Sequence, residues 1–419
     1  MWRFVGPGLL MAGAAIGVSH LVQSTRAGAS FGWSLTALVL AANLFKYPFF
    51  EFGHRFASLT GKTLLEGYKE QGRFYLYTFL GLNIVTSVVS VAGVVIVTAA
   101  LAENLLPGLF SIPTWSALLI TISLVISLVG QYRALDYFIK LMLAVLFIST
   151  VCAFAIAFGG NTLPGAEIAS QIFTLQNSKT AVWTSASLPF LIALMGWMPA
   201  PIELSVWQSI WVLEMKEQKK EDVPLKAALF DFNFGYAITV ILALLFMGLG
   251  AFVMYSSPAE FSPKPAEFAA QVVKLFTSQI GLWSTPFITM AAMTAMISTV
   301  ITLVDAYPKS LALGFGLVSR EPQSKKKSFV IWSLLVGFFG VALISFYSNR
   351  LKEMVDLATI LSFMLAPIFA FLNFKIVLRD GLTRNTLPVW IKVLSVLGLV
   401  FLTVFAVLYL ASVVAGLAR

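Results

Sequence analysis

The chain has 419 residues, of which 59% are hydrophobic and 11% charged, and a net charge of +9. Soluble domains carry about 25% charged residues, so this composition excludes an ordinary soluble domain and indicates lipid as the surrounding solvent. A single cysteine, Cys152, excludes an internal disulfide framework.

Eleven stretches are long and apolar enough to span a bilayer, for which about 20 residues are needed. In chain order they cover residues 4–27, 32–54, 74–102, 113–130, 135–159, 182–212, 227–256, 268–304, 328–347, 354–377 and 387–417. The connections are short and carry most of the charge. We therefore predict an all-α integral membrane protein of about eleven helices.

The lysines and arginines favour one orientation. With the N-terminus in the cytoplasm, 19 of the 28 basic residues fall in inside segments and 7 in outside segments. Because cytoplasmic loops are enriched in Lys and Arg, we expect a multi-pass protein of the cell membrane with a cytoplasmic N-terminus. This distribution also explains the positive net charge without a nucleic-acid partner.

Two stretches contain residues that break helices. The first includes Gly13-Ala14-Ala15-Ile16-Gly17-Val18-Ser19-His20, and the sixth includes Gly196-Trp197-Met198-Pro199-Ala200-Pro201-Ile202-Glu203. Two closely spaced prolines remove backbone donors and disfavour a continuous helix. Breaks at corresponding positions of two halves point to a solute site between them. The alternative is a proline kink and a glycine packing face.

Breaks in the first and sixth helices fit an inverted repeat of five plus five helices with one additional helix. The predicted units are residues 1–160 for the first repeat, 182–377 for the second and 387–419 for the eleventh helix. Five crossings separate the two breaks, so the two broken helices run in opposite directions.

Several short motifs resemble the Nramp (natural resistance-associated macrophage protein) family of divalent-metal transporters. They are Gly6-Pro7-Gly8-Leu9-Leu10-Met11, Ala27-Gly28-Ala29-Ser30-Phe31-Gly32, Ala42-Asn43-Leu44 and Thr60-Gly61-Lys62. The resemblance is dense over the first 70 residues. It implies a LeuT-like fold, helices 1 and 6 unwound at the substrate site, and secondary transport by alternating access.

The chain departs from this family at the metal ligands. Where the family has Asp-Pro-Gly-Asn in helix 1, this chain has Gly17-Val18-Ser19-His20. The family's helix 6 motif Ala-x-x-Met-Pro-His aligns with Trp197 to Ile202, so Ala200 replaces the methionine. A hard anionic ligand and a soft thioether ligand are therefore both lost.

The candidate site residues follow from these two motifs. Substrate contacts are predicted at Gly17, Ser19, His20, Trp197, Ala200 and Glu203, with His20 and Glu203 as tentative metal ligands. Possible coupling or supporting roles fall to Asp231, Ser298 and Thr299. The alternatives are a packed histidine, a solvated glutamate, a space-filling tryptophan, and hydroxyls bonded to their own helix.

Other charged residues of the spans receive ordinary interpretations. Lys46, Glu51 and Asp356 are expected to snorkel or to form ion pairs near helix ends. No nucleotide-binding loop and no metal-ligand spacing such as His-Glu-x-x-His occurs, so neither an enzyme nor a cofactor is expected.

Three functional hypotheses remain open at this stage. The first is a transporter of a cation, in particular a divalent metal ion with altered selectivity. The second is a transporter of a small organic solute such as an amino acid or amine, which the loss of both metal ligands and the presence of Trp197 favour. The third is a membrane sensor that transports nothing.

Overall fold

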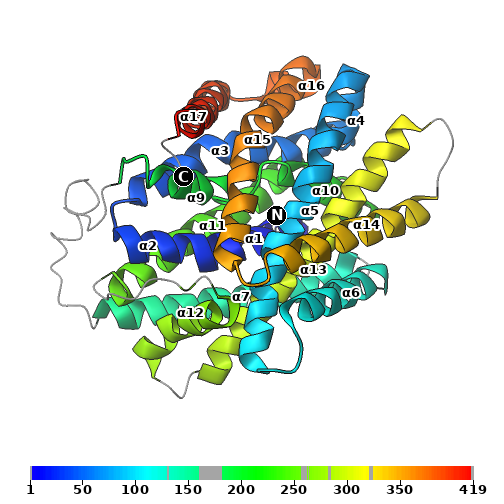
Figure 1. The fold of residues 1–419 in the computed structure, drawn as a ribbon. Helices are drawn as coiled ribbons and strands as arrows, with labels where there is room; N and C mark the ends of the chain where they lie inside the picture. Colours follow the sequence, from blue (N-terminus) through cyan, green and yellow to red (C-terminus); the bar gives the residue numbers. More distant parts are fainter. Residues whose placement is uncertain are drawn as a thin grey trace.

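The protein is known from a computed structural model that describes residues 2–129, 132–159, 182–255, 262, 264–281, 285–319 and 324–416. Residues 130, 160, 256 and 417–419, at which predicted spans or units end, lie outside this range. Within it the regular structure is helical (Figure 1).

The helices follow the predicted stretches closely. The first five stretches correspond to α1 (Pro7–Ala15) with η2 (Ser19–Ser24) and α2 (Thr25–Phe31), then α3 (Thr36–Thr60), α5 (Arg73–Leu105), α6 (Ile112–Val129) and α7 (Tyr132–Gly159). The later ones correspond to α9 (Leu188–Gly196) with α10 (Leu204–Lys219), then α11 (Leu225–Val253), α12 (Pro265–Ile280), α13 (Thr285–Val318), α14 (Lys325–Phe346), α15 (Leu351–Arg379) and α17 (Val389–Val414). Short helices η1 (Trp2–Phe4), α4 (Leu64–Gln71) and α16 (Gly381–Thr386) lie between spans.

One predicted span, residues 268–304, is wrong in its boundaries. It divides into α12 and α13, and α13 continues to Val318. Gly281 follows the end of α12 with a φ of +113°, a conformation that side chains disfavour. Pro286 is the second residue of α13, where a missing N–H costs nothing. Gly281 and Pro286 are sequence signals of this turn, but the apolar residues on both sides of them favour one long span.

The spans divide into an inner and an outer group. Six helices of the described residues are long and apolar enough to cross a membrane. In α5, 78% of the 18-residue apolar segment is buried inside the protein, whereas in α14 and α17 the buried share of this segment is 28% and 22%. Figure 1 shows α1 near the middle of the bundle and α17 at its edge. Apolar side chains on α14 and α17 thus face outward, as contact with lipid requires.

Glycines allow the inner helices to approach closely. A Cβ added at Gly28 of α2 would lie 1.8 Å from the carbonyl oxygen of Met247 in α11. A Cβ at Gly250 of α11 would lie 2.2 Å from the carbonyl oxygen of Thr25. Small residues at such contacts let two backbones pack directly against each other. The short helix after the first break is therefore held tightly against α11.

We expect Gly28→Ala to destabilise the protein, because the new methyl group collides with backbone that cannot rotate away. Overpacking costs about 1–3 kcal/mol, and more where backbone must move. Gly81→Ala is the matched control, since a Cβ there meets nothing within 4 Å in the interior of α5. Thermal midpoints of the two purified variants provide the measurement, and an equal effect of both would contradict this packing.

Candidate solute pocket between two broken helices

The first break separates α1 from η2. Helix α1 ends at Ala15, and Ile16 leaves the helical region with φ −86° and ψ 58°. The last carbonyls of a helix lack partners within it, and polar side chains beyond the break supply them. The Ser19 hydroxyl donates to the carbonyl of Ala15, and Nδ1 of His20 lies 3.0 Å from the same oxygen. The predicted interruption of helix 1 is confirmed.

The second break separates α9 from α10. Helix α9 ends at Gly196 and α10 begins at Leu204, with irregular backbone between them. Pro199 and Pro201 lie in this segment and can donate no backbone hydrogen bond. The predicted interruption of helix 6 is also confirmed. Both breaks lie deep in the protein, because Ile16 and Trp197 are each less than 5% exposed.

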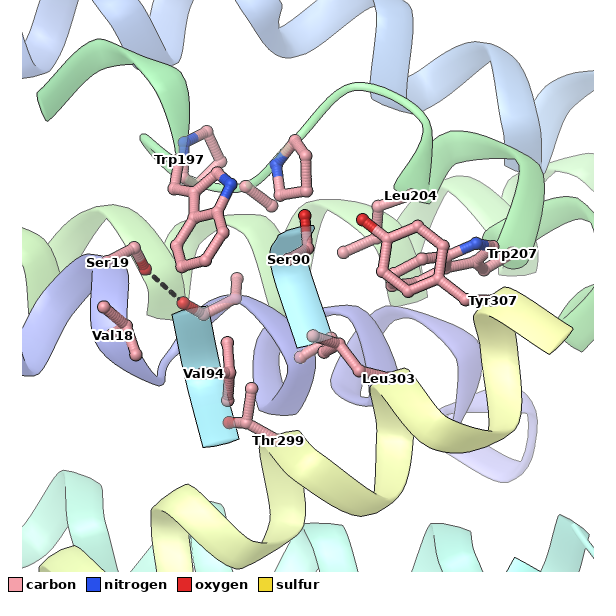
Figure 2. A pocket seen from close by; sticks show the side chains of 15 residues that line it. Val18, Ser19, Ser90, Val94, Trp197, Leu204, Trp207, Thr299, Leu303 and Tyr307 are labelled. Atoms are coloured by element: carbon pink, nitrogen blue, oxygen red, sulfur yellow. Dashed lines mark hydrogen bonds between the residues drawn. The ribbon is translucent and has the colours of Figure 1, made fainter. Parts of the chain in front are cut away.

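A pocket lies between the two breaks, with α5 and α13 forming its other walls. Its cavity volume is only about 20 Å³. That is room for roughly one or two waters, so the lining side chains nearly fill the pocket in this structure. Figure 2 shows Val18 and Ser19 on one side, Trp197 above them, and Thr299, Leu303 and Tyr307 along α13.

Apolar groups, aromatic rings and hydroxyls line the pocket. Three aromatic side chains contribute to it, namely Trp197, Trp207 and Tyr307. The polar side-chain groups of the lining residues are the hydroxyls of Ser19, Ser90, Thr299 and Tyr307 and the indole N–H groups of Trp197 and Trp207. The remaining lining side chains are alanine, valine, leucine and proline. No charged side chain and no imidazole, thiol or thioether is among these lining residues.

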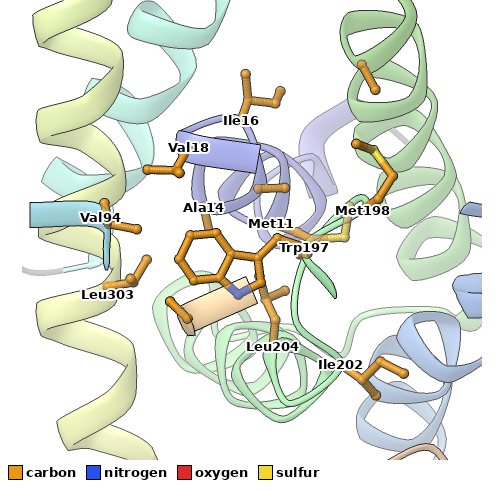
Figure 3. Packing of buried hydrophobic residues seen from close by; sticks show 14 of the residues in the cluster. Met11, Ala14, Ile16, Val18, Val94, Trp197, Met198, Ile202, Leu204 and Leu303 are labelled. Atoms are coloured by element: carbon orange, nitrogen blue, oxygen red, sulfur yellow. The ribbon is translucent and has the colours of Figure 1, made fainter. Parts of the chain in front are cut away.

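Trp197 is anchored at both ends. Its indole Nε1 donates to the Ser362 hydroxyl at 2.8 Å, and Gly93 of α5 leaves room for the far edge of the ring. Figure 3 shows the indole among Ala14, Val94 and Leu303. The ring thus fills volume and also presents a face to the pocket, so the two interpretations of Trp197 are compatible.

The predicted site residues separate into two groups. Ser19, Trp197, Ala200 and Thr299 line the pocket. Gly17 borders it indirectly, because a Cβ there would lie 2.8 Å from Oγ1 of Thr299. The position aligned with the family's aspartate therefore has no space for a side chain while Thr299 keeps its place.

His20 and Glu203 lie behind the pocket walls. His20 is fully buried, and its Nε2 lies 2.9 Å from the carbonyl oxygen of Thr239 in α11. Glu203 is fully buried as well, so the solvated alternative is wrong, and its Oε1 accepts a hydrogen bond of 3.1 Å from Tyr307. The two side chains bond different partners. Among the described residues, no group of three or more His, Cys, Asp or Glu side chains is placed to hold a metal ion.

The remaining predicted residues bond backbone. Asp231 accepts hydrogen bonds from the amides of Gly6 (2.9 Å) and Gly8 (2.6 Å) and so caps α1. Ser298 donates to the carbonyl of Ala295 in its own helix. Thr299 donates to Ala295 and also reaches the carbonyl of Gly13 at 3.1 Å, which links α13 to α1.

Sequence reasoning missed a polar contact between α2 and α15, which we name the Arg26 latch: Gln23, Arg26, Asp356 and Thr359. Arg26 donates to both carboxylate oxygens of Asp356, at 2.6 and 3.2 Å, and to Gln23 at 2.9 Å. Gln23 donates to Asp356 and Thr359, both at 3.2 Å. The latch ties α2 to α15, and the predicted ion pairing of Asp356 is confirmed.

The prediction for Lys46 is wrong. Its ammonium group does not reach water at a helix end; it is fully buried and bonds backbone carbonyls at the second break. Glu51 forms the expected ion pair, with Arg55 at 2.5 Å. The sequence shows how far Lys46 lies from the ends of its helix. It does not show that backbone carbonyl groups of a distant helix lie within hydrogen-bonding distance of the ammonium group.

The chain resembles known proteins over almost its whole length. An uncharacterized protein of Pasteurella multocida is 37% identical over 408 residues, covering 97% of this chain and 92% of that protein. The divalent metal cation transporter MntH of Listeria monocytogenes is 22% identical over 424 residues, covering 96% of this chain and 88% of that protein.

Solved transporter structures share the fold. A mutant of the manganese transporter of Eremococcus coleocola matches with a TM-score of 0.75 at 15% identity, covering 99% of this chain and 88% of that one. MhsT in complex with L-phenylalanine matches with a TM-score of 0.66 at 14% identity, covering 97% and 98%. The fold is therefore LeuT-like, as predicted.

The model of the family described as natural resistance-associated macrophage protein-like matches residues 8–412. This range includes both breaks and every residue that lines the pocket. The chain belongs to this Nramp family of secondary transporters, which are not enzymes.

Proposed function

We propose that this transporter carries a small organic solute of the amine or amino-acid class through the pocket between the two breaks. The observation that supports this choice is the chemistry of the lining: three aromatic rings and four hydroxyl groups. Aromatic faces attract organic cations and stack on apolar groups, and hydroxyls bond the polar end of a small solute.

The same lining disfavours a bare divalent ion. Such an ion loses its hydration shell on entering a low-dielectric site and needs anionic ligands in return. The positions aligned with the family's aspartate and methionine are Gly17 and Ala200, neither of which has a ligand group. An organic solute needs only a few hydrogen bonds and a shaped apolar surface.

A ligand screen followed by transport assays tests this proposal. We expect one or more amines or amino acids to raise the thermal midpoint of the purified protein, as a ligand that binds only the folded state must. The same compound should be taken up by proteoliposomes containing the protein. Selective stabilisation and uptake of Mn²⁺ or Mg²⁺, with no response to any organic solute, would reject the proposal.

Substitutions at Trp197 connect binding to this pocket. Trp197→Ala should weaken binding of the organic solute by about 2- to 30-fold, the equivalent of about 0.5–2 kcal/mol for a cation–π contact. Trp197→Phe keeps an aromatic face and should retain more affinity. Trp390→Phe is the matched control, because Trp390 is exposed on α17. Equal affinities in all three variants would place the binding site elsewhere.

Transport of a divalent metal ion with altered selectivity is the second candidate. It is supported by the metal transport named for the Listeria relative and by the buried carboxylate of Glu203, one hydroxyl group behind the lining. If a metal ion is the substrate, Glu203→Gln should abolish both the rise of the thermal midpoint with the metal and the uptake of the metal. Binding and uptake of an organic solute, by contrast, should persist in this variant.

We also propose that the protein lies in the cell membrane with its N-terminus in the cytoplasm, as the distribution of basic residues favours. We propose that the Arg26 latch, which joins α2 to α15, then closes the outer side of the pocket. An impermeant thiol reagent applied to either side of the membrane tests this orientation with a cysteine placed in the pocket.

A further inference from the structure

Lys46 lies too deep inside the protein to reach water. It is the eleventh residue of α3 and stands about 15 Å from the nearer end of that helix, at 1.5 Å per residue. Its side chain is 0% exposed. A charged group so far inside the membrane is costly and needs nearby partners.

The partners of Lys46 are three carbonyl groups at the break of helix 6. Nζ donates to the carbonyl oxygens of Met195 at 2.6 Å, Gly196 at 2.7 Å and Ala200 at 3.2 Å. An ammonium group has three N–H donors, so each donor has an acceptor. Met195 and Gly196 are the last residues of α9, where the helix dipole is negative. The Met195 carbonyl also accepts a backbone hydrogen bond of 3.3 Å from Met198.

An opposite charge stands at the other side of the break. Glu203 is the residue immediately before α10, at the positive end of that helix dipole. Its side chain is fully buried, and the same irregular segment separates it from the end of α9 that Lys46 contacts. Each end of the interrupted helix thus has a charge of the sign that its dipole favours, and both charges belong to the chain itself.

Transporters with discontinuous helices use such half-helix C-terminal ends and unwound carbonyls to coordinate cations. Here the Lys46 ammonium occupies that position. We propose that Lys46 is a tethered cation that replaces a dissociable monovalent cation at the break of helix 6, so that the folded transporter neither binds nor requires sodium or potassium there. This inference concerns ion coupling and holds for either candidate solute.

Removal of the amine tests the proposal by stability rather than by transport. Lys46→Ala should lower the thermal midpoint by about 5 °C or more, because a buried carboxylate and three carbonyls lose their partner. The space left by the side chain should then admit small cations. Sodium or methylammonium should therefore recover part of the lost thermal midpoint, and the recovery should saturate with cation concentration. Choline, at equal ionic strength, should restore nothing. Failure of every small cation to restore stability would overturn the proposal.

Three further proteins complete the test. Lys46→Met keeps the length of the side chain and fills the space, so its midpoint should fall without recovery by cations. Lys392→Met removes a half-buried lysine from α17, one of the outer helices, and should leave the midpoint unchanged. The wild-type protein should show no saturable effect of sodium relative to choline. The proposal would be contradicted if sodium stabilised the wild-type protein in a saturable way. It would also be contradicted if Lys46→Met had the same thermal midpoint as the wild type.

If Lys46→Ala does not fold, the double variant Lys46→Gln, Glu203→Gln takes its place. Replacing both members of a buried charged pair is tolerated better than removing one, so the double variant should be more stable than Lys46→Gln alone. Equal midpoints of these two variants would show that Lys46 does not compensate the charge at this break. None of these outcomes depends on identifying the solute, so the solute proposal succeeds or fails separately.

Discussion

Asp356→Ala should open one side of the pocket and destabilise the closed protein. Loss of the carboxylate leaves the guanidinium of Arg26, whose side chain is only 7% exposed, without its anionic partner. Breaking a buried ion pair in this way costs about 3–5 kcal/mol. The cost belongs at the lower end of that range, because the Asp356 side chain is 26% exposed. The ion pair stabilises the closed arrangement, in which α2 contacts α15, and an open arrangement does not require it. Its loss should therefore shift the population toward the open arrangement.

Thiol labelling measures the expected opening. Val18→Cys places a thiol in the pocket wall, and Cys152→Ala removes the native thiol. A change of about 1.4 kcal/mol in the balance between closed and open forms is tenfold in population, so we expect Asp356→Ala to accelerate labelling at least tenfold. Thermal midpoints of the same proteins report the loss of stability.

A matched control uses an ion pair on the protein surface. Lys62 and Glu70 lie 2.6 Å apart with side chains 46% and 55% exposed. Such pairs contribute about 0–1 kcal/mol, so Glu70→Ala should change neither labelling nor midpoint. Unchanged labelling in Asp356→Ala would show that the Arg26 latch does not hold the pocket closed.

Asp231→Ala should destabilise the protein strongly, because Asp231 caps the first half of the interrupted helix 1. The substitution leaves the amides of Gly6 and Gly8 without their acceptor. A buried donor that loses its partner costs about 1–3 kcal/mol, so the two together should lower the free energy of unfolding by about 2–6 kcal/mol. Denaturation of the purified protein measures this loss.

Asp231→Asn separates capping from ion coupling. The amide keeps one oxygen acceptor, so about half of the lost stability should be recovered and transport should persist. If Asp231 instead carried a coupled proton or cation, Asp231→Asn would abolish transport at nearly full stability. Asp222→Ala is the control, because that carboxylate is 86% exposed on the surface.

The positions of the helices were predictable because they depend on local composition. A run of about 20 apolar residues must span or be buried, wherever the rest of the chain lies. Gly17 and the Pro199–Pro201 pair marked the two breaks for the same reason, since their effect on backbone hydrogen bonding is intrinsic. The junction at Gly281 was missed because apolar sequence continues on both sides of it.

The site was only partly predictable. The sequence predicted Ser19, Trp197 and Ala200 as substrate contacts because they belong to the two breaks, and these three line the pocket. Thr299 also lines it, although it was predicted in a coupling or supporting role. It treated His20 and Glu203 as equally direct candidates, although both bond groups behind the lining. The direction in which a side chain points at an irregular backbone is decided by its neighbours and is not visible in residue spacing.

The membrane environment, the order of the helices and the two interruptions of backbone bonding could all be inferred from the amino-acid sequence alone. The groups that satisfy those interruptions became visible only in the packed molecule. Lys46 reaches carbonyls about 150 residues away along the chain, and Arg26 bonds a carboxylate 330 residues away. The difference arises because apolar length and missing donors are properties of a segment, whereas partners for buried charges and carbonyls exist only once distant helices have packed together.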